Sequence, residues 1–116
     1  VMGCGGDRDQ DKRAKMGHIA SFLSDHVIFT SDNPRFEDPQ VILDQIEAGV
    51  LPENSKKTLA ISDRKQAIKA ACKLAKSGDI LLVAGKGHES YQEIEGVRIP
   101  FDDKKITRLV LEALEK

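Results

Sequence analysis

Three glycines precede three charged residues in the segment Gly3–Asp9, which reads Gly-Cys-Gly-Gly-Asp-Arg-Asp. Glycines let a backbone approach a ligand closely, and the amides at the start of a helix attract anions. Asp7 and Asp9 can orient the guanidinium of Arg8, whose planar fork suits a carboxylate. The spacing is neither G-x-G-x-x-G nor G-x-x-x-x-G-K-[ST], so the segment alone fits an anion site or a tight turn between a strand and a helix.

The segment Ser31–Arg35 carries a second set of polar groups. Its Asp32 carboxylate only accepts hydrogen bonds, its Asn33 amide donates and accepts them, and its Arg35 guanidinium only donates them. Together these groups can bind both ends of an amino acid. Asx residues and proline are also common in turns, and Pro34 fixes its own φ, so a helix-entry turn explains every residue here except Arg35.

The third candidate segment is Gly85-Lys86-Gly87-His88-Glu89. Lys86 or His88 can neutralise a phosphate, and Glu89 can accept hydrogen bonds from an ammonium group. His88 fits a structural histidine as well, and no second histidine at H-x-x-x-H spacing indicates a metal site. A G-x-S-x-G elbow and a Ser or Cys nucleophile with its base are both missing, so we assign no catalytic residue.

Short strands and helices alternate along the chain and must position these segments. The helices are marked by apolar residues at helical spacing and by Asx or proline at their starts. The strands are marked by runs of β-branched residues. The predicted helices cover 12–24, 39–48, 63–77 and a last segment that begins at Asp102. Gly78 is expected as the C′ residue of the helix over 63–77. The predicted strands cover Val1-Met2, 26–30, 58–61, 80–84, 91–94 and 97–99. This order predicts an α/β layer structure on a mostly parallel sheet.

Two expectations about packing follow from the apolar residues. The first helix should bury Met16, Ile19, Ala20 and Leu23 and leave Arg13 outside that face. The run at 80–84 is the most apolar of the predicted strands.

Each of the three polar segments follows a predicted strand, and ligands of parallel sheets bind at the carboxyl ends of the strands. Their coincidence at one edge predicts a binding site there.

Composition narrows the class of protein. The chain has 116 residues, which fits a single domain over 1–116, and its net charge of −1 gives no general reason to bind nucleic acid or a membrane surface. It lacks an apolar run of membrane-spanning length and a signal pattern, so we expect a cytoplasmic protein. Cys4 and Cys72 form neither a C-x-x-C pair nor a zinc site, and Cys72 reads as core packing. A strand that opens with only Val1-Met2 suggests a chain cut from a longer protein.

Four motifs resemble, in order, the C-terminal domain of the MurE ligases. They are Gly3–Asp9 with Lys12-Arg13, Ser31–Arg35 with Glu37-Asp38-Pro39, Ala84–Glu89 with Tyr91-Gln92, and Pro100-Phe101-Asp102-Asp103. The resemblance covers nearly the whole chain and implies a Rossmann-like three-layer domain that lacks its first strand and helix. Family members often have proline after the Lys-Arg pair, where this chain has Ala14, a difference that affects little beyond local rigidity.

The resemblance implies the last of three domains in a cytoplasmic, ATP- and magnesium-dependent ligase of peptidoglycan synthesis, inactive by itself. Such ligases form an acyl phosphate on UDP-MurNAc-L-Ala-D-Glu, which the amine of meso-diaminopimelate attacks. A central domain outside this chain would bind most of the ATP and Mg²⁺, and no residue here is assigned to a metal. The matching residues for diaminopimelate are Arg8, Asp32, Asn33, Pro34, Arg35, Gly85 and Glu89; the weaker candidates for ATP or acyl-phosphate contacts are Asp7, Asp9, Lys12 and His88.

Two alternatives stay open at this point. A ligase of the same family can add L-lysine, although an arginine left unpaired by lysine would disfavour it by on the order of 10⁴. A non-catalytic Rossmann-like module that binds a nucleotide or an amino acid is the alternative from another class. A purely structural or interaction domain ranks third, because it leaves the Arg, Asp and Glu residues at one sheet edge unexplained.

Overall fold

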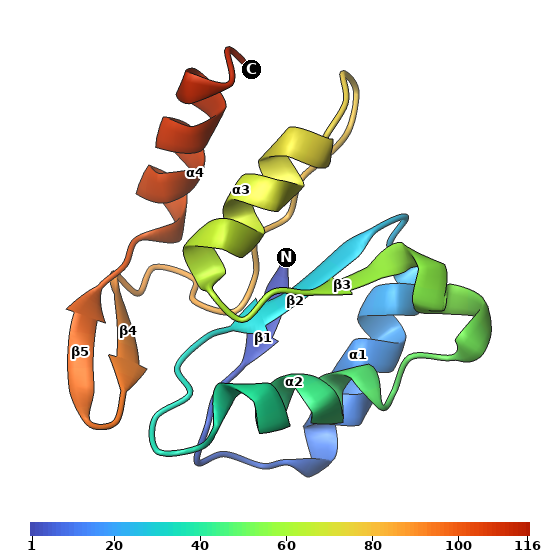
Figure 1. The fold of residues 1–116 in the computed structure, drawn as a ribbon, viewed down its shortest axis with the longest axis vertical. Coiled ribbons are helices and arrows are strands. Elements are labelled where there is room, and N and C mark those ends of the chain that lie inside the picture. Colours follow the sequence, from blue (N-terminus) through green and yellow to red (C-terminus); the bar gives the residue numbers. More distant parts are fainter.

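The computed structural model describes residues 1–116. The elements in chain order are β1 (Met2–Cys4), α1 (Asp11–Leu23), β2 (Val27–Ser31), α2 (Pro39–Glu47), the 3-10 helix η1 (Pro52–Lys57), β3 (Thr58–Ala60), α3 (Arg64–Leu74), β4 (Tyr91–Ile94), β5 (Val97–Pro100) and α4 (Asp103–Ala113). Strands β1, β2 and β3 form a parallel sheet in that order, and β4 and β5 form a separate antiparallel pair. The predicted α/β fold with a mostly parallel sheet is confirmed (Figure 1).

The sheet lies between two pairs of helices. In Figure 1, α1 and α2 lie below the sheet and α3 and α4 lie above it. One cluster of buried side chains joins β2 to α2 through Phe29, Leu43 and Ile46, and a second joins β2 to α3 through Ile28 and Ala67. Each large apolar side chain buried in this way stabilises the fold by about 1.5–3 kcal/mol. These contacts make the three-layer arrangement.

Strand β2 is the central strand of the sheet, and every one of its residues is buried. Its sequence Val-Ile-Phe-Thr-Ser is rich in β-branched and aromatic residues, which suit a strand covered on both faces. Phe29 pairs with Met2 of β1 on one side and with Ala60 of β3 on the other. The chain therefore leaves β2 at Ser31, at the same sheet edge where it leaves β1 at Cys4.

Local capping and turn chemistry set the element boundaries that the sequence predicts. Asp38, Asp63 and Asp102 each accept a backbone N–H of the helix they precede, at 2.9, 3.0 and 3.1 Å. The turn between β4 and β5 places Glu95 at φ 50° and Gly96 at φ 79°, the pattern of a tight hairpin. The predictions for α2, α3, α4 and the hairpin are confirmed within a few residues.

The expected buried face of α1 is wrong. Arg13, Gly17 and Ser21 face the protein, whereas Ile19 is 54% and Leu23 is 76% exposed. A Cβ at Gly17 would overlap the carbonyl oxygen of Ile46 in α2, so the two helices cross too closely for larger side chains at that face. Small residues four positions apart, rather than apolar ones, therefore mark the contact surface of this helix.

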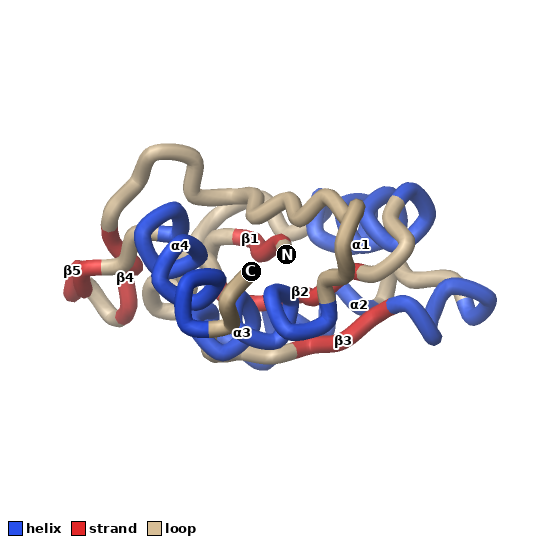
Figure 2. The backbone as a smooth tube through the Cα atoms, turned by 90° about the horizontal axis from the view of Figure 1, so that it is seen from above, coloured by secondary structure: helices blue, strands red, loops and turns tan.

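The segment 80–84 forms no strand, contrary to the prediction, and Ile80 is 95% exposed. Val1 lies opposite it: its amino group donates to the Leu82 carbonyl and its own carbonyl accepts from Ala84 N–H, both at 2.9 Å. Figure 2 shows the loop between α3 and β4 running past β1. Gly78 lies in this loop and is not the C′ residue, because α3 ends at Leu74.

None of the helices combines the length and the apolar character that a membrane crossing requires.

Candidate functional site

Two of the polar segments join directly behind the carboxyl ends of β1 and β2. Gly6 N–H donates to the Asn33 carbonyl at 2.7 Å, and Arg35 Nη1 donates to the Gly6 carbonyl at 2.8 Å. A Cβ at Gly6 would overlap the carbonyl oxygen of Pro34, so only glycine permits this approach. The loop after β1 and the loop after β2 are therefore one structural unit.

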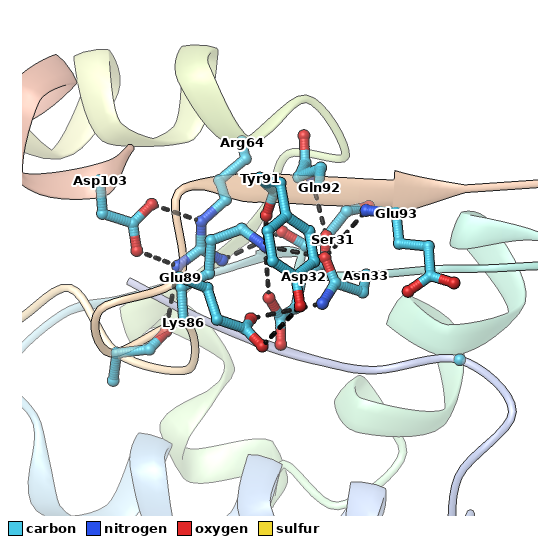
Figure 3. Close-up of polar contacts among 12 residues, drawn as sticks. Ser31, Asp32, Asn33, Arg64, Lys86, Glu89, Tyr91, Gln92, Glu93 and Asp103 are labelled. Carbon is cyan, nitrogen blue, oxygen red and sulfur yellow. Dashed lines mark hydrogen bonds and ion pairs between the residues drawn. The ribbon is translucent and has the colours of Figure 1, made fainter. Parts of the chain in front are cut away.

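Lys86 brings the third segment into this unit. Its ammonium is fully buried and donates to Asp32 Oδ1 at 2.8 Å, to Asn33 Oδ1 at 2.9 Å and to the Tyr91 carbonyl at 2.8 Å (Figure 3). An ammonium has three donors, and all three are used. Lys86 therefore joins the loop after β2 to the start of β4, and it has no donor left for the phosphate that the sequence suggested.

Glu89 lies at the open side of this network, and it is half-buried. The Asn33 Nδ2 donates to its Oε1 at 3.4 Å, and the Tyr91 hydroxyl donates to its Oε2 at 3.4 Å. The Tyr91 ring is covered by the guanidinium of Arg98, 4.4 Å from the ring centroid. Each Glu89 oxygen keeps lone pairs beyond these long hydrogen bonds, so the carboxylate can accept hydrogen bonds from a ligand.

Arg35 adopts a left-handed backbone conformation with φ 52°. Backbone pairing holds it there: its N–H donates to the Glu93 carbonyl at 3.0 Å, and its carbonyl accepts from Glu95 N–H at 2.8 Å. Within the chain its guanidinium donates hydrogen bonds through Nη1, and Nε lies 3.7 Å from a Glu93 carboxylate oxygen. Nη2 makes no hydrogen bond in the chain and is available to a carboxylate ligand.

A cavity of about 390 Å³ opens beside this unit. Both early polar segments and the Gly85 loop contribute to its wall. Its lining consists of Gly3, Cys4, Gly5, Arg8, Asp9, Lys12, Arg13, Met16, Asp32 and Gly85. Arg8 and Lys12 supply positive charge and Asp9 and Asp32 supply negative charge, so the cavity fits a zwitterionic or multiply charged small molecule.

Arg13 fixes the rear wall of the cavity. It is 1% exposed, and its guanidinium donates to both Glu37 oxygens at 2.9 and 3.0 Å, to Gln45 at 2.7 Å and to the Gly5 carbonyl at 2.9 Å. The Asp7 N–H donates to the same Glu37 carboxylate at 2.7 Å. The hydrogen bonds from Arg13 hold the pKa of Glu37 below its usual range, and the hydrogen bond from the Asp7 N–H lowers this pKa further.

The predicted site residues fall into three groups. Arg8, Asp32 and Gly85 line the cavity together with the weaker candidates Asp9 and Lys12. Of the remaining candidates, Asn33 and Glu89 belong to the network around Lys86. Arg35 donates to the Gly6 carbonyl, and Pro34 packs on Gly6.

Two of the weaker candidates lie away from this cavity. His88 is exposed on the loop before β4, and Asp7 uses its carboxylate to accept the Phe36 N–H at 3.4 Å. Their proposed contacts with ATP or acyl phosphate stay predictions.

Sequence reasoning missed the buried roles of Arg13, Lys86 and Tyr91. The signal for Arg13 was present, because Gly17 and Ser21 follow it at intervals of four and mark one helix face. For Lys86 the flanking glycines gave no such signal, because its acceptors come from segments up to 54 residues away in sequence.

Two kinds of chemistry receive no support from this site. Side chains of His, Cys, Asp and Glu do not gather in groups of three or more that could hold a metal ion. Burial raises the pKa of the Cys4 thiol, which lines the cavity, so it stays protonated at neutral pH and is a poor nucleophile.

Comparisons with known proteins agree with this architecture. Residues 1–87 match the family model described as Mur ligase, glutamate ligase domain. The UDP-N-acetylmuramoyl-L-alanyl-D-glutamate--2,6-diaminopimelate ligase of Cytophaga hutchinsonii is 59% identical over all 116 residues, and that of Bacteroides thetaiotaomicron is 57% identical over 93% of the chain. The chain spans 24% and 22% of those two proteins, about a quarter of their length.

A solved structure gives the same result for the fold. A structure of a UDP-N-acetylmuramoyl-L-alanyl-D-glutamate--2,6-diaminopimelate ligase superimposes with a TM-score of 0.92 and 46% identity, over 100% of this chain and 24% of the other. The family match covers most of the chain, and the superposition covers all of it. The chain therefore belongs to the Mur ligase family, as a Mur ligase C-terminal domain of the kind found in MurE ligases.

Proposed function

We propose that this chain is the C-terminal, amino-acid-binding domain of an ATP-dependent ligase that adds meso-diaminopimelate to UDP-MurNAc-L-Ala-D-Glu in the cytoplasm. In this reaction ATP phosphorylates the D-glutamate side-chain carboxylate and leaves as ADP. The amine of diaminopimelate then attacks the acyl phosphate, forms the amide and releases phosphate. The names of the relatives support the reaction class.

The observation that carries the proposal is that two arginines and two carboxylates lie at one sheet edge. Arg8 faces the cavity, and Arg35 lies behind the adjoining loop with Nη2 available. Asp32 and Glu89 lie nearby. Meso-diaminopimelate carries two carboxylates and two ammonium groups, so guanidinium forks and carboxylates complement both of its ends. Lysine has only one carboxylate and would leave a guanidinium without a partner.

The residues of this chain fit ATP, but they do not fit Mg²⁺, the second implied cofactor. Arg8 and Lys12 line the cavity without a carboxylate partner within ion-pair distance, which fits a phosphate group of ATP or of the acyl phosphate. For Mg²⁺ the fit is absent, because no group of three potential ligands exists. Magnesium would therefore be bound by other parts of the full-length ligase.

Replacing Arg35 with methionine in the full-length ligase tests the amino-acid role. We expect the KM for meso-diaminopimelate to rise by about 10- to 100-fold, because a charge-assisted hydrogen bond to a carboxylate is lost. The KM for ATP should stay within about twofold. Steady-state phosphate release at varied concentrations of each substrate measures both constants.

Arg108→Met provides the matched control, since Arg108 is exposed on α4 and makes no ion pair in the chain. Its kinetic constants should equal those of the unmodified ligase. An unchanged KM for diaminopimelate in the Arg35→Met enzyme would remove Arg35 from the substrate site.

A further inference from the structure

Lys86 is buried at the centre of the site network but has no free donor for a ligand. A buried ammonium costs several kcal/mol of desolvation unless it is paired and hydrogen-bonded, so a lysine here must be compensated by its partners. Asp32 supplies the opposite charge, and Asn33 and the Tyr91 carbonyl supply the other two acceptors. A residue of this kind acts on its neighbours rather than on substrate.

The ammonium fixes the orientation of the Asn33 amide. The Asn33 Oδ1 accepts from Lys86 at 2.9 Å and from the Glu93 N–H at 3.0 Å, which uses both of its lone pairs. The amide nitrogen must then point the other way, where it lies 3.4 Å from Glu89 Oε1. A flipped amide would place its NH₂ group against the two donors. Lys86 and Glu93 together therefore direct the Nδ2 donors toward Glu89.

The same ammonium also places the second contact of Glu89. Its bond to the Tyr91 carbonyl holds the start of β4, and the Tyr91 hydroxyl donates to Glu89 Oε2 at 3.4 Å. Gln92 adds to this placement, because its Nε2 donates to the Asp32 carbonyl at 2.7 Å. Both hydrogen bonds to Glu89 thus come from groups that Lys86 holds (Figure 3).

We propose that Lys86 is a positioning residue that orients the Asn33 amide and the Tyr91 backbone, so that the Glu89 carboxylate is presented to an ammonium group of the incoming amino acid. This inference rests on the proposed function and deepens it. It assigns Lys86 no contact with ATP, with the acyl phosphate or with the amino acid.

A double-mutant cycle in the full-length ligase tests the proposal with Lys86→Met, Glu89→Gln and the double variant. We expect Lys86→Met to raise the KM for meso-diaminopimelate about 10-fold and to leave the KM for ATP unchanged. Because Lys86 acts through Glu89, the double variant should show no larger effect than Glu89→Gln alone. A purely structural role would lower the active fraction and kcat while leaving both KM values unchanged.

Asn33→Asp is the second variant and keeps the test decisive if Lys86→Met fails to fold. An aspartate retains the acceptor for Lys86 and for the Glu93 N–H, but it replaces the donor that faces Glu89 with a second carboxylate. We expect the KM for diaminopimelate to rise, and we expect Glu89→Gln to raise it no further in this background, because the Asn33→Asp change already displaces the Glu89 carboxylate from the position that binds the ammonium. Lys104→Met, at an exposed position, is the control.

Additive effects in the cycle, or a KM for ATP that rises in parallel, would overturn the role of Lys86 while leaving the proposed function intact. If phosphate release by the full-length ligase does not depend on diaminopimelate at all, both the proposed function and this inference are wrong. The two failures are therefore distinguishable within one set of assays.

Discussion

Replacing Arg64 with methionine is expected to lower the free energy of unfolding by about 3–5 kcal/mol. The Arg64 guanidinium is buried and pairs with Asp103 through Nε at 2.8 Å and Nη2 at 2.7 Å. It also donates to the Ser31 carbonyl at 3.0 Å and to the Ala84 carbonyl at 3.2 Å. The single substitution leaves the Asp103 carboxylate buried without its partner, and it releases α4 and the 80–84 loop from the sheet.

Urea-induced unfolding of the protein measures this loss. The double variant Arg64→Met with Asp103→Asn should recover part of the stability, because it removes the unpaired charge. Arg108→Met on the exposed side of α4 should change the free energy of unfolding by less than about 0.5 kcal/mol. A loss below about 1 kcal/mol for Arg64→Met would show that the pair does not hold these elements together.

Arg13→Met is expected to cost about 2–4 kcal/mol of unfolding free energy, somewhat less than Arg64→Met because the Glu37 side chain is 19% exposed and keeps some hydration. The substitution removes four hydrogen bonds that join α1, the loop after β1, the loop after β2 and α2. Lys15→Met, at an exposed position of the same helix, is the matched control and should be nearly neutral.

The pH dependence of stability gives an independent test of the same pair. The pKa of Glu37 is lowered in the folded protein, so its contribution to stability is fully present above the unfolded-state pKa and is lost as the pH falls through the folded pKa. Unfolding measured from neutral to acidic pH should show this loss, and Arg13→Met should weaken it. An acid profile with the same slope in both proteins would contradict the assignment to this pair.

Several elements follow from local chemistry and were predictable. Asp38, Asp63 and Asp102 cap their helices, and aspartate is one of the residue types strongly preferred at that position; Glu95-Gly96 adopts the positive φ of a tight hairpin. Strand β2 was predictable because its β-branched and aromatic residues suit burial on both faces. In each case the residues that carry the signal lie within a few positions of one another along the chain.

Tertiary contacts decided the elements that the sequence misplaced. The apolar residues of α1 predicted the wrong face, because the helix meets α2 at Gly17, where only a small residue fits, and buries the long Arg13 instead of Ile19. The run at 80–84 has the composition of a strand and makes two backbone hydrogen bonds with Val1, but it is not part of the sheet.

The meeting of the three polar segments was predictable, and the hydrogen bonds that join them were not. Three polar segments after strands were expected at one sheet edge, and Gly6, Asn33 and Lys86 bring them together there. The sequence could not show that all three donors of Lys86 are used inside the protein, because its acceptors are two side chains after β2 and a backbone carbonyl in β4. The role of a buried cation is set by long-range geometry.

The measurement that tests the central claim most directly is ATP-dependent phosphate release by the full-length ligase with UDP-MurNAc-L-Ala-D-Glu, comparing meso-diaminopimelate with L-lysine. We predict strong release with diaminopimelate and a kcat/KM for lysine that is lower by on the order of 10⁴, because lysine leaves a guanidinium of the site unpaired. Equal or stronger release with lysine would contradict the assignment of Arg8 and Arg35 to the second carboxylate of the substrate.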